Sequence, residues 1–319
     1  MGKQSDGRAG NRVPWFFATP TRLFAWLFVS LLVPLAILVV VLSGQARRVM
    51  HDQAVIQNSA TARLAAATAR AHLDALSRFA ESFATRRTLL RAVRDGDAEG
   101  VERNLRDLVE RGGPIERVFV TDLAGVERFD YPHDPAVIGK SFAHRDWYRG
   151  VAHTGRTYVS EIYLRAAAPR QYVVAAATPL AERGGRTFAY LVAQRSIGDI
   201  AAELGALRPS AAGTILLVDH HGNHLLEAAD GDIGLGSLGR HPVISRALIA
   251  GQLNVDAPSP VTGGASLISV ARANAAGWMV LAEQPASFVY APLRLMRKVM
   301  FEWLVAWFLV MLAVGFGWF

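Results

Sequence analysis

Arg145, Trp147 and Tyr148 lie close together in the sequence, and Tyr163 follows them on a predicted strand. A guanidinium group binds a carboxylate through two parallel charge-assisted hydrogen bonds, and aromatic side chains form pocket walls that exclude water. These residue types at this spacing indicate a site for a small solute that carries a carboxylate. The spacing leaves one alternative open, in which the aromatic side chains belong to a core and Arg145 pairs with an acid such as Asp146.

A second group that could do chemistry consists of Asp219, His220, His221 and His224. Imidazoles and a carboxylate together can hold zinc or nickel, so this cluster offers an alternative function, a membrane-anchored periplasmic metal-dependent hydrolase. The four residues occupy a predicted turn, however, where Asp and Gly have conformational reasons to occur. We therefore predict no metal site, no cofactor and no catalytic residue.

The segment Gly234–Gly239 fits the pattern G-x-G-x-x-G, which occurs in dinucleotide-binding loops. That fingerprint requires a strand before it and a helix after it in a parallel βαβ unit, whereas Pro242 follows here and the surrounding pattern is antiparallel. The sequence also contains no G-x-S-x-G, H-E-x-x-H or Walker pattern. These observations predict that the chain is not an enzyme.

The elements that must position these residues are repeated along the chain. Two short strands around Asp122-x-x-Gly125 correspond to two strands around Asp219-x-x-Gly222, at an offset of 97 residues. A short helical pattern then ends at Gly155 in the first copy and at Gly251 in the second. Further strands are predicted at 157–163, 171–178 and 187–196 in the first copy and at 266–271 and 278–283 in the second. The pattern predicts two related α+β modules, each an antiparallel sheet with helices packed on it.

Two apolar runs contribute much of the hydrophobic content, which is 51% of 319 residues. Residues 23–42 contain no charge, and a helix of that length, at about 1.5 Å per residue, crosses a hydrocarbon layer of about 30 Å. Residues 303–319 form a second run with Trp near both ends. We expect both runs to span a membrane. A cleaved signal peptide is the alternative for the first run, although its apolar region exceeds the ~7–15 residues typical of such signals.

The region between the two runs begins with an Ala-rich stretch, from residue 45 to about residue 88, that has no Gly or Pro and predicts one long helix. Residues 97–111 predict a second helix that ends at the Gly112-Gly113-Pro114 stop. The net charge is +7, but basic residues are scattered among acids, which predicts no nucleic-acid partner. Cys is absent, which excludes disulfide scaffolds and thiolate zinc sites.

This order of elements resembles the double Cache (dCache) sensor domains of bacterial transmembrane receptors, over nearly all of residues 45–298. Residues 144–149 (HRDWYR) and 154–163 (TGRTYVSEIY) are similar to the family's Arg-x-Trp-Tyr and Gly-x-x-Tyr-x-Ser-x-x-Tyr patterns. Residues 277–285 resemble the closing strand of the membrane-proximal module. The resemblance implies an α+β fold with a long N-terminal helix and two tandem PAS-like antiparallel-sheet modules, flanked by two transmembrane helices. The implied organisation is a cytoplasmic tail (1–22), a first transmembrane helix (23–43), a long helix with a helical connection (44–112), a membrane-distal Cache module (113–200), a membrane-proximal Cache module (201–298) and a second transmembrane helix (299–319).

The resemblance also implies a binding site. In family members that sense amino acids, the Arg and aromatic residues hold the ligand carboxylate, and an Asp on the last strand of the module accepts the amine. On the corresponding strand of this chain, Gln194 or Arg195 takes the place of that acid, which favours a carboxylate-bearing metabolite over a free α-amino acid. The expected ligand-binding residues are Arg145, Trp147, Tyr148, Tyr163 and Gln194. Candidates for a second anionic group of the ligand are Arg170, Arg195 and Lys140.

We therefore expect a multi-pass receptor of the bacterial inner membrane that binds a small extracytoplasmic ligand in the distal module. The change would pass through the second transmembrane helix. Expected partners are the ligand and membrane lipid, and the resemblance implies a homodimer. It also implies a cytoplasmic signalling domain or subunit that is not present in this chain, because the sequence has no cytoplasmic residue after the second run. An adhesion role without a ligand is a third possibility.

Overall fold

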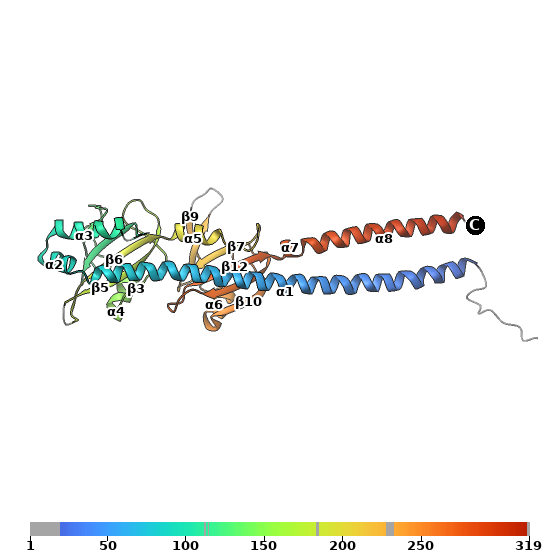
Figure 1. The fold of residues 1–319 in the computed structure, drawn as a ribbon, viewed down its shortest axis with the longest axis horizontal. Helices are drawn as coiled ribbons and strands as arrows, with labels where there is room; N and C mark the ends of the chain where they lie inside the picture. Colours follow the sequence, from blue (N-terminus) through green and yellow to red (C-terminus); the bar gives the residue numbers. More distant parts are fainter. Residues whose placement is uncertain (1–19, 112, 114, 183–184, 228–232, 318–319) are drawn as a thin grey trace, which may run out of the picture. The chain divides into compact units, whose positions relative to one another are not determined.

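The computed structural model describes residues 20–317 except residues 112, 114, 183–184 and 228–232. Its helices are α1 (Pro20–Ala84), α2 (Arg87–Asp95), α3 (Ala98–Arg111), α4 (Asp146–Thr154), α5 (Ile197–Gly205), α6 (Pro242–Ala250), α7 (Ala286–Val289) and α8 (Ala291–Gly317). Its strands are β1 (Arg117–Asp122), β2 (Glu127–Tyr131), β3 (Tyr158–Val159), β4 (Tyr163–Leu164), β5 (Tyr172–Ala181), β6 (Thr187–Ser196), β7 (Thr214–Val218), β8 (Asn223–Glu227), β9 (Ile233–Ser237), β10 (Gln252–Pro258), β11 (Ala265–Arg272) and β12 (Met279–Pro285). The fold has the predicted α+β class, with a long N-terminal helix and antiparallel sheets (Figure 1).

The chain divides into two compact units, one of Met1–Gln53 with Val289–Phe319 and one of Ala54–Phe288. In the first unit, α1 continues without a break through the apolar run, and Pro34 lies inside the helix. Among the described residues, one helix, α1, is long and apolar enough to cross a membrane. No residue of its most apolar stretch is buried.

Two other predicted segments of the first unit fall partly outside the described residues. The run predicted as a second span is helical as part of α8, but residues 318–319 are not described, and its spanning role stays a prediction. Residues 1–19 of the predicted cytoplasmic tail also lie outside the described residues. The same holds for Gly112 and Pro114 of the predicted helix stop in the second unit.

The first module consists of β1–β6 with α4. Its sheet has the strand order β2-β1-β6-β5-β3, and β4 also pairs with β5. Because side chains alternate along a strand, Val118 and Val120 of β1 contribute to the core that includes α1 and α3, whereas Phe119 packs in a core with Trp147 and Val151 of α4. Helices therefore cover both faces of the sheet, which explains the almost continuous apolar sequences of β5 and β6.

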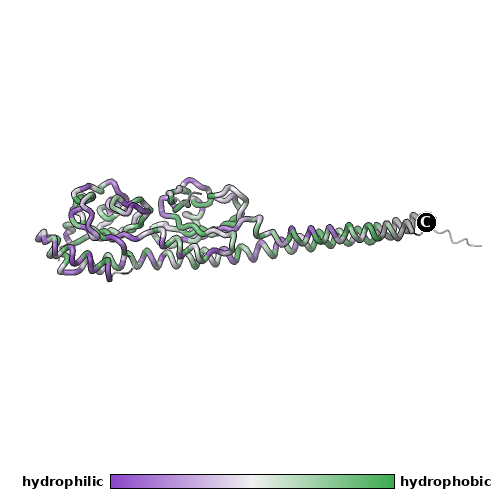
Figure 2. The backbone as a smooth tube through the Cα atoms, turned by 90° about the horizontal axis from the view of Figure 1, so that it is seen from above, coloured by the Kyte–Doolittle hydropathy of each residue, from purple (hydrophilic) through white to green (hydrophobic). Residues whose placement is uncertain are grey.

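The second module consists of β7–β12 with α6. Four of its strands form a sheet of order β10-β11-β12-β7, and β8 and β9 form a separate two-stranded sheet. Val243 and Ile244 of α6 pack on one face of the larger sheet. Leu217 and Val280 belong to the same core as the first module and α1. The two modules therefore lie one after the other along α1 and share one apolar core (Figure 2).

The correspondence of the two turns predicts that the two strands around the Asp219 turn pair with each other, as the two strands around the Asp122 turn do. This prediction is wrong. In the first module β1 pairs with β2, but β7 pairs with β12, and β8 pairs with β9. Two glycines of the G-x-G-x-x-G segment, Gly234 and Gly236, lie in β9, the strand that pairs with β8, and Gly239 lies in the turn after it. A Cβ on Gly236 would lie 2.5 Å from the ring of His224, so the glycine leaves the space that this buried ring occupies.

Glycines also end the helices that were predicted from the repeat. Helix α4 ends at Gly155 with φ of 62°, and α6 ends at Gly251 with φ of 74°. Both glycines adopt the left-handed conformation that commonly follows the last helical residue, and their N–H groups donate to carbonyls of the last turn. At the opposite ends, Arg145 is the residue before α4 and His241 is the residue before α6.

Candidate ligand-binding site

A small cavity lies between α4 and the first module's sheet. Its volume is about 20 Å³, which is room for about one water molecule. The lining residues are Arg117, Phe119, Glu127, Val137, Phe142, Arg145, Trp147, Tyr163, Ala166, Ala167 and Gln194. Four of the five residues predicted to bind ligand, Arg145, Trp147, Tyr163 and Gln194, thus surround one cavity.

Arg145 reaches this cavity from the position before α4, where its backbone is extended. Its guanidinium carbon lies 4.7 Å from the centre of the Tyr163 ring, a cation–π contact. One terminal nitrogen donates to the carbonyl oxygen of Leu164 at 3.1 Å. The Nε of Arg145 is buried and has no hydrogen-bond partner among the described residues. The guanidinium is therefore fixed in place while keeping a donor for another group.

Gln194 and Tyr163 form a hydrogen bond at the wall of the cavity. The Nε2 atom of Gln194 donates to the Tyr163 hydroxyl oxygen at 2.7 Å, and burial raises the pKa of Tyr163, so this hydroxyl is neutral. The Oε1 atom of Gln194 is buried and has no partner in the described part of the chain. The wall thus offers a free acceptor, a carbonyl oxygen, in place of the carboxylate expected from the resemblance.

The two aromatic residues of α4 have different surroundings. Trp147 is fully buried, lines the cavity and contacts the ring of Phe119 edge-on at 5.5 Å. Tyr148 is absent from the cavity lining, and its hydroxyl donates to the carbonyl oxygen of Leu123 at 2.8 Å. Its ring packs below the Asp122 turn, where a Cβ on Gly125 would lie 2.9 Å away. Tyr148 therefore supports the turn, and the geometry gives it no contact with the cavity.

Two charged residues of the cavity were missed by the sequence analysis. Arg117 lies opposite Gln194 in the pairing of β1 with β6, and Glu127 lies on β2. Arg117 forms a short, buried ion pair with Asp130, and its guanidinium is 3.9 Å from Glu127. Burial, together with the neighbouring Asp130 charge, raises the pKa of Glu127 from its usual 4.5 to about 8. Because Arg117 pairs more closely with Asp130 than with Glu127, burial dominates, and Glu127 is a neutral acid at pH 7.

A charged residue within an apolar strand was the signal for Arg117. In the sequence Arg117-Val-Phe-Val, the arginine has the same alternation as Phe119, so it belongs to the same face. Glu127 gave no such signal. Lys140 and Arg170, proposed for a second anionic group, are exposed and do not line this cavity. Arg195 instead contacts His72 of α1 at 2.7 Å.

The predicted histidine cluster separates in the structure. The Asp219 carboxylate accepts hydrogen bonds from the backbone N–H groups of His221, Asn223 and Ile162 and from the side chain of Asn223. His224 is buried against Gly236. Only His220 and His221 remain near other acidic groups, and these acids come from the first module.

Two antiparallel-sheet modules that follow one another along a long helix, with a polar cavity in the first, define a class of tandem sensor domain. The Cache domain family model dCache_1 matches residues 46–293, and the chain belongs to this family. Members of the family are ligand-binding sensor domains of membrane receptors, located outside the cytoplasm. No curated protein sequence matches the chain.

Solved structures of chemoreceptor domains have the same fold. The ligand-binding domain of amino acid chemoreceptor PctB from Pseudomonas aeruginosa PAO1, in complex with L-Gln, has 19% identity and a TM-score of 0.56, covering 72% of this chain and 90% of that chain. The domain of chemoreceptor CtaA from Pseudomonas fluorescens, in complex with L-isoleucine, has 15% identity and a TM-score of 0.58, covering 77% and 98%. The P. aeruginosa PAO1 chemoreceptor PctC domain, in complex with GABA, has 20% identity and a TM-score of 0.52, covering 70% and 95%. Identities at this level show a shared fold alone.

Proposed function

We propose that this chain is the sensor part of a receptor that binds a small carboxylate-bearing solute in the cavity of the first module. The observation that carries the proposal is the Arg145 guanidinium, which faces the cavity over the Tyr163 ring with a buried Nε that has no partner among the described residues. A carboxylate would satisfy this donor, and burial would strengthen the bond.

The membrane part of the proposal has separate support. Large apolar side chains of α1, such as Ile37 and Val40, are exposed, and a surface of this kind needs an apolar environment. We propose a multi-pass protein of the bacterial inner membrane, in which α1 and α8 span the bilayer and the modules lie outside the cytoplasm. In this proposal α8 transmits the change to a cytoplasmic signalling domain or subunit, and the receptor acts as a homodimer.

The cavity must enlarge to hold a solute, because its present volume is about 20 Å³. Ala166 and Ala167 line it from the segment between β4 and β5, and displacement of this segment would enlarge the cavity. A solute then stabilises an open arrangement over the closed one, and it does so by its difference in affinity for the two. That difference is the signal that the receptor would transmit.

Glu127 gives the cavity a way to distinguish solutes that carry an ammonium group. Gln194 offers no carboxylate for such a group, but the Glu127 carboxyl lines the same cavity, and its buried Oε1 accepts no hydrogen bond from the described residues. Its pKa of about 8 means that an ammonium must displace a proton from Glu127. The affinity of such a solute therefore rises as the pH increases to about 8, and a solute without an ammonium lacks this gain.

The test uses the full chain in detergent micelles. A thermal-shift screen of organic acids, amino acids, amines and purines identifies a binding solute, and calorimetry measures its affinity. We expect Arg145→Ala to weaken binding by about 2–5 kcal/mol, the usual cost when a buried charge loses its partner. Arg149→Ala, which removes an exposed arginine from the same helix, is the matched control and should leave affinity unchanged. Equal affinities of wild type and Arg145→Ala would refute this site.

A further inference from the structure

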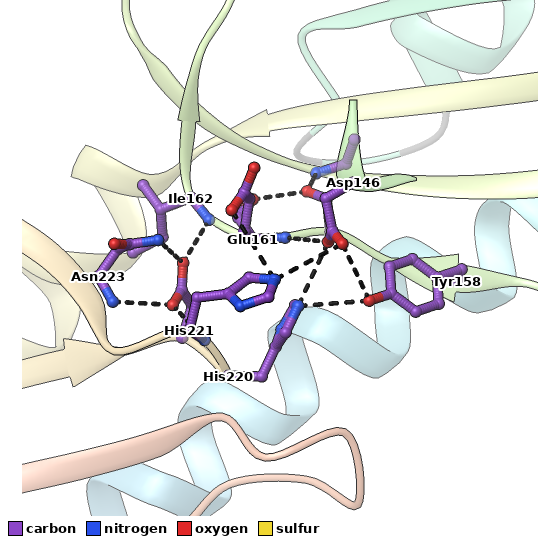
Figure 3. A network of polar contacts seen from close by, with 10 residues as sticks. Asp146, Tyr158, Glu161, Ile162, His220, His221 and Asn223 are labelled. Atoms are coloured by element: carbon purple, nitrogen blue, oxygen red, sulfur yellow. Dashed lines mark hydrogen bonds and ion pairs between the residues drawn. The ribbon is translucent and has the colours of Figure 1, made fainter. Parts of the chain in front are cut away.

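The turn between β7 and β8 makes a polar contact with the first module (Figure 3). Asp219 anchors this turn, because its carboxylate accepts the Ile162 N–H at 2.8 Å and the His221 N–H at 2.8 Å. Asp219 is completely buried, so the turn has a fixed position against the segment before β4. The anchored turn directs His220 and His221 toward two acids of the first module, Asp146 and Glu161.

The nitrogen and oxygen atoms of this cluster lie close to the spacing of a metal coordination sphere. The Nε2 of His220 is 3.3 Å from the Oδ2 of Asp146, and the Nε2 of His221 is 3.7 Å from the Oδ1 of Asp146. The Nε2 of His221 is also 3.9 Å from the Oε2 of Glu161. Tetrahedral bonds of about 2.0–2.2 Å place neighbouring ligand atoms about 3.3–3.6 Å apart. The ligand atoms of Asp146, His220 and His221 all lie within 4.8 Å of one another. Side-chain movements on the order of 1 Å would bring them around one ion, and Glu161 would have to turn toward it as well.

The first-module acid is also held in place as metal ligands commonly are. The Tyr158 hydroxyl donates to Asp146 at 3.3 Å, and the Glu161 N–H donates to Asp146 at 3.0 Å. Hydrogen bonds of this kind orient a ligating carboxylate, and the two oxygens keep lone pairs for an ion. Asp146 is buried while His221 is exposed, so an ion can reach the cluster from solvent.

We propose that Asp146, His220 and His221, with Glu161 as a fourth ligand, bind a divalent transition-metal ion between the first and second modules. Two imidazoles and two carboxylates suit zinc best, and cobalt or nickel would fit the same ligands. The ion joins one ligand pair from each module and so strengthens the contact made by Asp219. The site is separate from the solute cavity, and it would exist whether or not that cavity binds a carboxylate.

The experiment measures zinc binding by the full chain, purified in detergent without a histidine tag and treated with a chelator. After dialysis against zinc chloride, the wild type should retain one zinc per chain by mass spectrometry. Zinc should also raise the midpoint of thermal unfolding, because an ion bound only by the folded protein stabilises it. Cobalt chloride should give the visible absorption bands of four-coordinate cobalt.

The variant His220→Gln/His221→Gln removes both imidazoles, and His153→Gln is the matched control because His153 is an exposed histidine of α4. Changes next to metal ligands cost about 10–100-fold in affinity, so loss of two ligands should cost more than about 100-fold. The control should bind as the wild type does. Absence of stoichiometric zinc in the wild type would overturn the proposal, and this result does not depend on the folding of any variant. Zinc binding by the double variant equal to that of the wild type would also overturn it.

Discussion

The two modules share one strand order, β1-β6-β5-β3 in the first and β7-β12-β11-β10 in the second, but they differ in the strand after the Asp-x-x-Gly turn. In the first module β2 pairs with β1 and extends the sheet. In the second module β8 leaves the sheet and pairs with β9. The extra edge strand brings Glu127 to the cavity and Asp130 to Arg117. The pairing of β2 with β1 thus distinguishes the module that has this cavity from the other module.

The two modules also differ at one pair of residues that face each other on neighbouring strands. Arg117 lies opposite Gln194 on β1 and β6, and the equivalent pair on β7 and β12 is Thr214 opposite Glu283. Glu283 is buried, its pKa is raised by burial, and its Oε1 accepts a hydrogen bond from the Ser259 hydroxyl at 3.0 Å. The second module keeps the register but replaces a cation with a hydroxyl. The second module therefore has neither the cation nor the amide at this pair, and the proposal of carboxylate binding concerns the first module alone.

The turns differ in a similar way. Asp122 and Asp219 each accept two backbone N–H groups of their own turn through one carboxylate oxygen. The other oxygen of Asp122 pairs with exposed Arg128, whereas the other oxygen of Asp219 accepts the N–H of Ile162 in the first module. One turn design therefore serves local structure in the first module and contact between modules in the second.

The largest effects should come from the fully buried tryptophan of each module, Trp147 and Trp278. Replacing either with Ala should lower the free energy of unfolding by about 3–5 kcal/mol, measured by urea denaturation of the full chain. Only Trp147→Ala should also weaken solute binding, because Trp278 belongs to the core shared with α1. An equal loss of affinity in Trp278→Ala would break the distinction between the modules.

The two turn aspartates should differ in their contribution to stability. Asp219→Ala leaves four donors without their acceptor, three of them backbone N–H groups, and should cost about 3 kcal/mol in unfolding free energy. Asp122→Ala acts at an exposed turn and should cost about 1 kcal/mol. Equal costs in the same denaturation experiment would show that the contact with Ile162 adds nothing to stability.

Glu127 should make the stability of the chain depend on pH. The folded pKa of about 8 lies above the usual 4.5, so the folded state binds more protons than the unfolded state between these values. Stability attributable to Glu127 is therefore complete below about pH 4.5 and falls as the pH rises to about 8, by at most about 1.4 kcal/mol per pH unit. Between pH 5 and pH 8, the urea concentration at the unfolding midpoint should fall more for the wild type than for Glu127→Gln. Parallel pH profiles of the two proteins would contradict this assignment.

The smallest effect should come from Arg128, which pairs with Asp122 at 2.6 Å on the surface. Replacing Arg128 with Ala should cost about 0.2–1 kcal/mol, because water and salt screen an exposed pair. The difference between low and high salt in denaturation midpoint should shrink in the variant. A cost as large as that of Asp219→Ala would mean that the turn of the first module also depends on its second oxygen.

The sequence was sufficient where local patterns decide the structure. The strand predicted at 187–196 coincides with β6, and Gly155 and Gly251 end the predicted helices, because alternation and glycine conformation act over a few residues. The partner of β8 could not be predicted, since β8 and β2 follow similar turns and the choice depends on β9, whose glycines are typical of a loop.

The site shows the same limit. The motif resemblance pointed to Arg145, Trp147, Tyr163 and Gln194, which the structure brings to one cavity. Glu127 was not predicted because the pairing of β1 with β2 shifts register between Val120 and Thr121, and this irregularity decides which side chains of β2 point inward. The binding role of all five predicted residues, Tyr148 included, stays a prediction.

Two residues of the solute cavity are direct neighbours of residues that hold the modules together. Arg145 precedes Asp146, and Tyr163 follows Ile162, whose N–H bonds to Asp219. If the cavity binds a solute as proposed, a backbone shift at either position on binding would reach the contact between the modules through a single peptide bond. Val137, Ala166 and Ala167 also line the cavity and do not adjoin Asp146 or Ile162 in the sequence, so their contact with a solute would have no such direct route to the junction.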